Sequence, residues 1–229
     1  MNRIAARCER EAGKPMAKLR EKIKTELNKH ADDTGYPVKP QKIICDLRKV
    51  MDPEDIVISD VGAHKMWMAR MFQAERPNTC IISNGFASMG IALPGAIAAK
   101  LVYPERNILA VAGDSGFMMN SQEIETAVRL GLNITVIIFN DNKYGLIEWH
   151  QLRHYGRKSH IDVTNPDFVK FAESFGAKGY KVENADGLEG ILKTAMNDGT
   201  VSIIDCPVDY DENMKLTARL KGMKSIDQD

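Results

Sequence analysis

The stretch GDSGFMMNSQEIETAVRLGLNITVIIFNDN, from Gly113 to Asn142, decides the fold of this chain. An apolar run at residues 108–112 leads into it and predicts one buried strand. A second run, β-branched and apolar, covers residues 134–139 and predicts another. Each run stops at a short polar turn that contains an aspartate, Asp114 in the first and Asp141 in the second.

The segment between the two runs has the pattern of a single helix. Asn120 stands three residues before Glu123, which predicts an N-cap with its reciprocal partner. Gly131 is placed to end the helix. Apolar residues recur between these limits at helical spacing: Ile124, Ala127 and Val128. The whole stretch therefore predicts a strand–helix–strand unit.

Parallel strands joined by one crossover helix place their carboxyl ends on the same edge of the sheet. We therefore expect Asp114 and Asp141, 27 positions apart, to face one crevice, where ligands of open α/β sheets bind. Asn140 and Asn142 add amide oxygens to the second turn. Hard oxygen ligands suit Mg²⁺ or Ca²⁺, and Mg²⁺ commonly shares its coordination shell with phosphate.

The first turn also has the composition of an anion site. Gly113 and Gly116 let backbone N–H groups approach an anion, and the Ser115 hydroxyl adds a donor. The two turns together predict a metal-bridged diphosphate site. A Gly-Asp-Ser-Gly sequence also surrounds the nucleophile of trypsin-like proteases, but there it lies in an all-β fold. A lone Gly-Asp at a strand end is often only a turn, and that alternative stays open for each turn taken singly.

The stretch resembles the diphosphate-binding motif of thiamine diphosphate-dependent enzymes, in which Gly-Asp-Gly is followed, just under thirty residues later, by Asn-Asn. This chain departs from that motif in two places: Ser115 replaces the third-position glycine, and Asp141 replaces the second asparagine. The resemblance implies a magnesium ion held by Asp114, by Asp141 and by the backbone carbonyl of Lys143. It also implies thiamine diphosphate as the cofactor.

Two further segments are similar to those of the acetolactate synthase group, the catabolic type above all. The first is Asp60-Val61-Gly62-Ala63-His64, which in that group contacts the diphosphate. On its own, this segment reads as a helix-start turn with an exposed histidine. The second is the segment at 84–90, where the resemblance places Met89 beneath the cofactor rings. The residues of these segments that the resemblance assigns to cofactor binding are Gly62, Ala63, His64, Ala87, Ser88 and Met89.

The segment that follows the second turn, YGLIEWHQ at 144–151, corresponds in the family to a helix over the substrate pocket. From it the resemblance adds Tyr144, Gly145, Leu146 and Ile147 to the cofactor site. Leu146, Ile147 and Gln151 are also our candidates for lining the substrate pocket, and plain helix packing is the equal alternative for each. No catalytic residue is identified within the chain. In the family, the glutamate that activates the cofactor lies on a separate pyrimidine-binding domain.

The remaining sequence predicts alternating helices and strands, hence a three-layer α/β/α fold with a mainly parallel sheet. We expect a polar helix or linker at residues 1–36, the diphosphate-binding domain at 37–210 and a tail at 211–229. The expected elements are helices at 40–50, 65–72, 88–101, 165–175 and 188–197, and strands at 55–59, 80–83, 179–182 and 201–206.

Composition sets broad limits on this 229-residue chain. Its net formal charge of +0 favours no nucleic-acid partner, and no apolar run reaches the roughly 18 residues that cross a bilayer. The N-terminus has no signal-peptide core, and the four cysteines form no CxxC pair, so we expect a cytoplasmic protein with reduced thiols.

The resemblance implies decarboxylation of pyruvate and carboligation to a second 2-oxo acid, in a homo-oligomer with FAD possible through another domain. Because family enzymes are more than twice as long, we expect this chain to be the diphosphate-binding domain alone, inactive without a pyrimidine-binding domain or subunit. Three alternatives remain. They are another thiamine diphosphate enzyme (pyruvate oxidase, 2-oxo acid decarboxylase or other carboligase), a non-catalytic α/β binding subunit, and a Rossmann-type nucleotide-binding domain without its GxGxxG signature.

Overall fold

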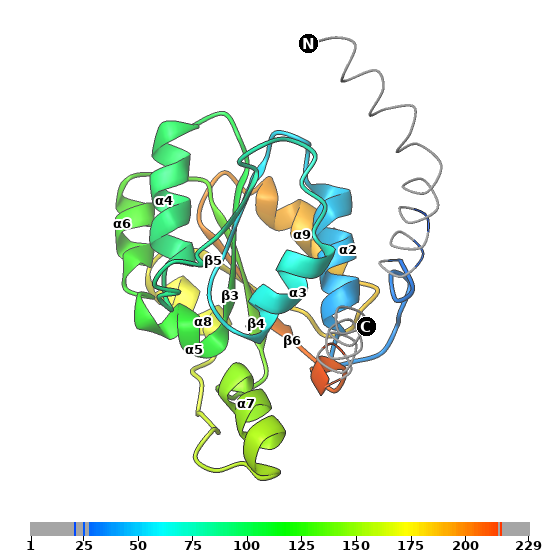
Figure 1. Ribbon diagram of the computed structural model, residues 1–229. Helices are drawn as coiled ribbons and strands as arrows, with labels where there is room; N and C mark the ends of the chain where they lie inside the picture. Colours follow the sequence, from blue (N-terminus) through cyan, green and yellow to red (C-terminus); the bar gives the residue numbers. More distant parts are fainter. Residues whose placement is uncertain (1–20, 22–24, 26–27, 215, 217–229) are drawn as a thin grey trace.

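A computed structural model describes residues 28–214, together with residues 21, 25 and 216. Six parallel strands form one sheet in the order β2-β1-β3-β4-β6-β5, with helices packed on both faces (Figure 1). The predicted three-layer α/β/α class is therefore confirmed. In the described part of the chain the strands are β1 (Ile56–Ser59), β2 (Cys80–Ile82), β3 (Ile108–Gly113), β4 (Thr135–Asn140), β5 (Lys178–Lys181) and β6 (Ser202–Pro207).

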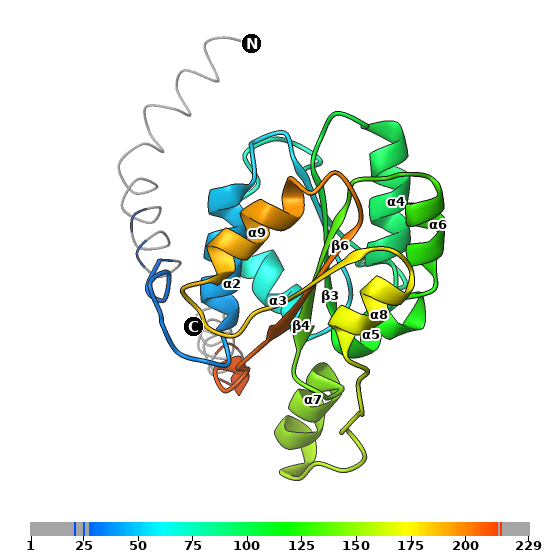
Figure 2. The ribbon, with the colours of Figure 1, turned by 180° about the vertical axis from the view of Figure 1, so that it is seen from behind.

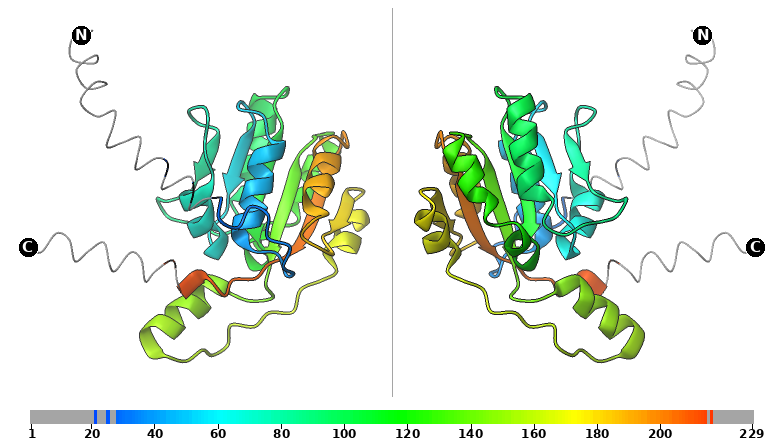
Figure 3. Two further views of the ribbon diagram at one scale, coloured as in Figure 1. Left: turned by 90° about the vertical axis from the view of Figure 1, so that its right-hand side faces the viewer. Right: turned by 90° about the vertical axis from the view of Figure 1, so that its left-hand side faces the viewer.

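The helices belong to two layers and one projecting element. One layer contains α2 (Pro40–Val50), α3 (Ala63–Met71) and α9 (Leu188–Met196). The other contains α4 (Ala92–Val102), α5 (Asp114–Met119), α6 (Glu123–Arg129) and α8 (Phe168–Ser174). The remaining helix, α7 (Gly145–Tyr155), lies beyond the carboxyl edge of the sheet (Figures 2 and 3).

In strand β3, successive side chains point to opposite faces of the sheet and so contribute to both hydrophobic cores. Leu109 and Val111 point into the layer of α2, α3 and α9, whereas Ile108 and Ala110 point into the layer of α4, α6 and α8. A central parallel strand is buried on both faces, so its residues are apolar without interruption. Burial on both sides fixes the register of β3 against β4, with Gly113 opposite Phe139. That register sets the positions of the two aspartate turns.

Two of the helix starts predicted from the sequence are wrong. Asn120 does not cap a helix at its N-terminus, because an additional helix, α5, occupies residues 114–119 and ends at Asn120. Helix α6 begins at Glu123 without a side-chain cap, although it ends before Gly131 as expected. The helix expected from residue 88 begins at Ala92, because Gly90 just before it has a φ of +86° that breaks a right-handed helix.

Asn165 does not open the next helix either. Helix α8 begins at Phe168, and Asp167 is its N-cap, accepting a hydrogen bond from the Lys170 N–H at 3.2 Å. The Asn165 side chain turns instead toward the carboxyl edge of the sheet. The other expected elements are present, with ends displaced by a few residues.

The polar helix expected near the N-terminus lies mostly outside the described residues, and the domain limits at 37 and 210 stay predictions. Past the second limit, the Trp67 indole donates a 2.6 Å hydrogen bond to Asn213, so the chain there still packs on α3. No helix in the described residues combines the length and the apolar character that a membrane crossing needs.

A pair of glycine substitutions tests the packing of α8 on β5. A Cβ added at Gly179 would lie 2.6 Å from the backbone of Val169, so Gly179→Ala should lower the free energy of unfolding by roughly 1–3 kcal/mol. Gly190, inside α9, faces open space, and Gly190→Ala should raise it by about 0.5–1 kcal/mol. Urea unfolding with unchanged m-values measures both. Equal midpoints for the two variants would contradict this packing.

Candidate functional site

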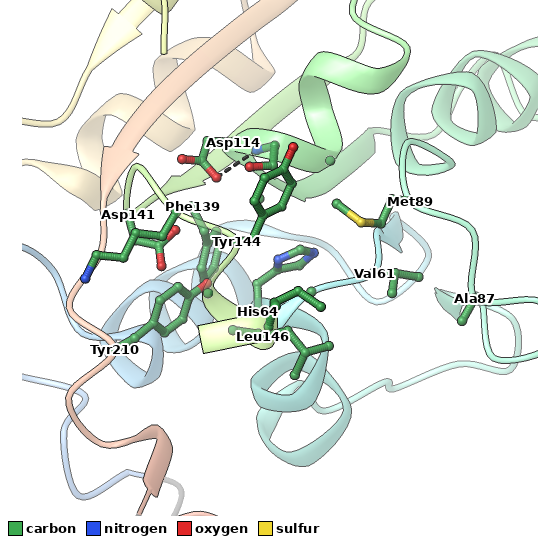
Figure 4. Close-up of a pocket in the computed structure, with 18 residues that line it drawn as sticks. Val61, His64, Ala87, Met89, Asp114, Phe139, Asp141, Tyr144, Leu146 and Tyr210 are labelled. Carbon is green, nitrogen blue, oxygen red and sulfur yellow. Dashed lines mark hydrogen bonds between the residues drawn. The ribbon is translucent and has the colours of Figure 1, made fainter. Parts of the chain in front are cut away.

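A cavity opens at the carboxyl edge of the sheet, where the segments after β1, β3 and β4 meet (Figure 4). All but one of the residues predicted to contact the cofactor line it, together with Lys143. They come from four separate segments: Gly62, Ala63 and His64; Ala87 and Met89; Gly113, Asp114, Ser115 and Gly116; and Asp141, Tyr144, Gly145, Leu146 and Ile147. Three further lining residues were not predicted from the sequence: Val61, Phe139 and Tyr210.

Asp114 forms one side of the acidic end of this cavity. It is the first residue of α5 and is 1% exposed. Its Oδ1 accepts a hydrogen bond from the Ser115 N–H at 2.7 Å, and its Oδ2 accepts one from the Asn165 amide at 2.6 Å. Burial nevertheless raises the pKa of Asp114, since the two donors offset only part of the lost hydration. Neutral hydrogen-bond donors therefore orient the Asp114 carboxylate, but they do not neutralise its negative charge.

Asp141 forms the other side of the acidic end. Burial, and then the negative charge of Asp114, raises the pKa of Asp141 to about 7. The chain passes close to this carboxylate, because a Cβ added at Gly145 would lie 2.6 Å from its Oδ2. Two carboxylates that raise each other's free energy in one crevice are the arrangement that a divalent cation stabilises.

Asn165 connects the two aspartate turns, and sequence reasoning assigned it elsewhere. Its single amide nitrogen lies 2.6 Å from Asp114 Oδ2, 3.0 Å from Asn140 Oδ1 and 3.2 Å from Asn142 Oδ1. The residue is far from all three in sequence and precedes a proline, so it resembles an ordinary helix start. Only the return of the chain from α7 to the sheet brings it into the site.

Two residues that line this cavity have a buried polar side-chain atom without a hydrogen-bond partner. Across the described part of the chain, three buried side-chain oxygen or nitrogen atoms have no hydrogen-bond partner: Gln41 Oε1, His64 Nε2 and Ser115 Oγ. The last two belong to residues that line the cavity. An unpaired buried polar atom costs about 1–3 kcal/mol, so two of them in one cavity point to a polar ligand that satisfies them.

His64 is not the exposed histidine that its sequence context alone suggested. It is 1% exposed and its ring lies 5.9 Å from that of Phe139. Burial lowers the pKa of His64 to about 4, against a hydrogen bond with the Asp60 backbone that raises it. His64 is therefore neutral at pH 7, and a neutral imidazole can present one N–H to an anion.

The opposite end of the cavity is apolar. Figure 4 shows Val61, Ala87 and Met89 on the side away from Asp141. Ala87 has a φ of +52°, an uncommon conformation for a residue with a Cβ, and such backbone strain tends to occur at ligand sites. Leu146 and Ile147 enter from the first turn of α7. The cavity thus combines an acidic end with an apolar end.

Two predicted residues lie outside the cavity. Ser88 is exposed and does not line it, although both of its neighbours do. Gln151 does not line it either, because its side chain binds the Ser159 backbone, accepting from the N–H at 2.7 Å and donating to the carbonyl at 3.1 Å. Gln151 therefore holds the loop after α7, and the structure does not bring it to the pocket where we expected it.

The donor set fits a magnesium-bound diphosphate better than a metal bound by protein alone. No group of three or more histidine, cysteine, aspartate or glutamate side chains that could hold a metal ion occurs among the described residues. Asp114 and Asp141 would leave most of an octahedral shell to the Lys143 carbonyl, water and ligand oxygens, which is typical of Mg²⁺. The unpaired atoms of His64 and Ser115 fit the phosphate oxygens.

Comparison with known proteins agrees with this geometry. The family described as "Thiamine pyrophosphate enzyme, C-terminal TPP binding domain" matches residues 60–206, from the end of β1 into the last strand, β6. The chain belongs to this family. The predicted resemblance is confirmed, and the structure gives the family's binding domain in this sequence.

Among the individual relatives of this chain are acetolactate synthases from bacteria and yeast. An acetolactate synthase of Bacillus subtilis (strain 168) is 43% identical over 188 residues, covering 82% of this chain and 33% of the relative. A catabolic acetolactate synthase of Raoultella terrigena is 38% identical, with 81% and 33% covered. The mitochondrial acetolactate synthase catalytic subunit of Saccharomyces cerevisiae is 33% identical, with 85% and 28% covered. The chain thus spans about a third of the length of these relatives.

The buried histidine predicts a particular pH dependence of stability. The pKa of His64 is about 6.5 in the unfolded chain and about 4 in the fold, so its contribution is complete above pH 6.5 and is lost as the pH falls toward 4. Wild type should lose about 3 kcal/mol more than His64→Gln between pH 7 and pH 4. Urea unfolding of both proteins at several pH values measures the difference. Parallel pH profiles would mean that His64 is not held neutral.

Proposed function

We propose that this domain binds thiamine diphosphate through Mg²⁺ and serves as the diphosphate-binding part of an acetolactate synthase-like enzyme. One observation carries the proposal: Asp114 and Asp141, with the unpaired His64 Nε2 and Ser115 Oγ, meet in one cavity whose other end is apolar. The cofactor has the same division, with a charged diphosphate at one end and aromatic rings at the other.

Each part of the site has a role in this proposal. Asp114, Asp141 and the backbone carbonyl of Lys143 would hold the metal. His64 and Ser115 would donate hydrogen bonds to phosphate oxygens, and the backbone N–H groups near Gly113 and Gly116 would add to them. Met89 and Ala87 would contact the rings and exclude water from them. Leu146 and Ile147 would line the space left for a substrate.

Bound thiamine diphosphate supplies the electron sink that decarboxylation of a 2-oxo acid requires. The protein orients it: the acidic end fixes the charged tail, and the apolar end fixes the rings. Among the described lining residues, the carboxylates are Asp114 and Asp141, both at the acidic end. We therefore propose that a carboxylate from another domain or subunit completes the apolar end, and that the working enzyme is a homo-oligomer.

The remaining functional assignments are also part of the proposal. The substrates are pyruvate and a second 2-oxo acid, in keeping with the acetolactate synthases among the relatives. FAD, where the full enzyme uses it, would bind through another domain. The protein would act in the cytoplasm, and the domain would extend over residues 37–210 between a polar segment and a tail.

Removal of one metal ligand tests the binding site. Asp114→Ala should abolish Mg²⁺-dependent binding of thiamine diphosphate in isothermal titration calorimetry, because Asp141 alone holds the ion weakly. Asp52→Ala is the matched control: Asp52 is exposed and precedes β1, at the opposite edge of the sheet. It should leave the affinity unchanged. An unaltered affinity in Asp114→Ala would sink the metal assignment.

The need for a second domain gives another expected result. The purified chain, supplied with thiamine diphosphate, Mg²⁺ and pyruvate, should form no 2-acetolactate above the enzyme-free rate, since nothing in the described cavity can activate the cofactor rings. A colorimetric assay for acetoin after acidic decarboxylation of the product measures this. Steady production by the purified chain would refute the requirement, while leaving the cofactor site intact.

A further inference from the structure

The segment that carries Ala87 and Met89 has no regular secondary structure. It runs from the end of β2 to the start of α4. Phe86 within it is fully exposed, at 101%, and Ala87 has a left-handed backbone. Such a segment does not define the wall of a cavity by itself, so something else must fix the position of Met89.

Gly90, the residue after Met89, is held from both sides. Its N–H donates to both carboxylate oxygens of Asp60 at 2.9 Å, and its carbonyl accepts from the Asn120 amide at 2.8 Å. Asp60 follows β1, and Asn120 ends α5, which follows β3. These two residues therefore connect an irregular segment to the end of strand β1 and to the end of helix α5.

The arrangement requires glycine at position 90. Its φ is +86°, and an added Cβ would lie 2.7 Å from the Asn120 amide nitrogen and 3.0 Å from Met119 Cβ. Asp60 is equally confined, because a Cβ added at Gly116 would lie 3.2 Å from its Oδ2. Asp60 is 1% exposed, and Gly90 is buried. We call these three residues, Asp60, Gly90 and Asn120, the Gly90 clamp.

The clamp residues do not line the cavity themselves, whereas their neighbours Val61 and Met89 do. All the carboxylates of the lining lie at the far, acidic end (Figure 4). Asn120 bonds to Gly90, next to Met89, and therefore acts on a ligand through the apolar wall, whereas Asp60 also lies against Gly116 of the diphosphate turn. The influence of Asn120 should fall on the ring portion of the ligand and spare the diphosphate portion.

We propose that Asp60 and Asn120 are positioning residues that hold Met89 and Ala87 against the rings of thiamine diphosphate, and so set affinity for the rings independently of the diphosphate. This inference rests on the proposed function. In this proposal, two different parts of the site hold the cofactor. The aspartate turns hold its diphosphate, and the Gly90 clamp positions the apolar wall against which its rings pack.

Asn120→Ala tests the clamp with two probes, thiamine diphosphate and inorganic diphosphate, each titrated with Mg²⁺ by calorimetry. Loss of the hydrogen bond to the Gly90 carbonyl should raise the Kd for thiamine diphosphate about three- to tenfold. The Kd for inorganic diphosphate should change less than about twofold, which also shows that the variant's acidic end is folded. Asn120→Asp, which keeps the shape and loses the amide donor, should behave like Asn120→Ala.

Asn133→Ala is the matched control. The Asn133 amide also donates to a distant backbone carbonyl, that of Met196 at 3.4 Å, but before β4 at the opposite edge of the sheet. This variant should bind both probes like wild type, even if its stability falls. The ratio of the Kd for thiamine diphosphate to the Kd for inorganic diphosphate should therefore stay the same when a variant is only less stable.

The possible outcomes distinguish failure of the clamp inference from failure of the proposed function. If wild type binds both probes and Asn120→Ala binds them equally well, or more weakly by the same factor, the clamp inference is overturned and the proposed function stands. If wild type binds neither probe, the proposed function is overturned, and the clamp inference with it. A selective loss of thiamine diphosphate affinity supports the clamp.

Discussion

Two carboxylates confined to one buried edge of a parallel sheet are the constraint on which this structure depends. Strands β3 and β4 are neighbours in parallel register, with Gly113 opposite Phe139, so the turns that follow must lie side by side. Asp114 and Asp141 occupy those turns, and burial, followed by the negative charge of Asp114, raises the pKa of Asp141 to about 7. Under the proposed function, a divalent cation between the turns would offset this cost.

The surrounding residues limit that cost without removing it. Asn165 places one amide among three acceptors of the two turns, and the Ser115 N–H supports Asp114. Both donors are neutral, so they orient the Asp114 carboxylate without compensating its charge, and the charge of Lys143 offsets only part of the effect of burial on Asp141. His64 Nε2 and Ser115 Oγ add unpaired polarity to the same space. Two continuous apolar cores, one on each face of the sheet, stabilise the fold enough to offset the free-energy cost of these buried polar groups.

Local sequence predicted the sheet and the acidic turns because both follow from short-range pattern. An apolar run such as residues 108–112 specifies a buried strand, and chain connectivity then puts Asp114 and Asp141 on one edge. The roles of Asn120 and Asn165 could not be predicted in this way. Each was placed at a helix start by local pattern, yet each bonds to a residue 30 or 51 positions away in sequence. The same holds for the burial of His64, which depends on packing against Phe139.

The two ends of the cavity tolerate sequence change differently, and the physical reason lies in the interactions that each uses. At the acidic end, a metal ion would accept any hard oxygen, so Asp141 can stand where related motifs have asparagine, and a small residue such as Ser115 still fits the turn where they have glycine. At the apolar end, the lining has no charged side chain, and the position of Met89 depends on the left-handed backbone conformation of Gly90. Gly90 has no substitute there, since any side chain would meet Asn120. Under the proposed function, the changes in the motif would leave the charged tail held, and the orientation of the rings would depend on Gly90, a residue that does not line the cavity.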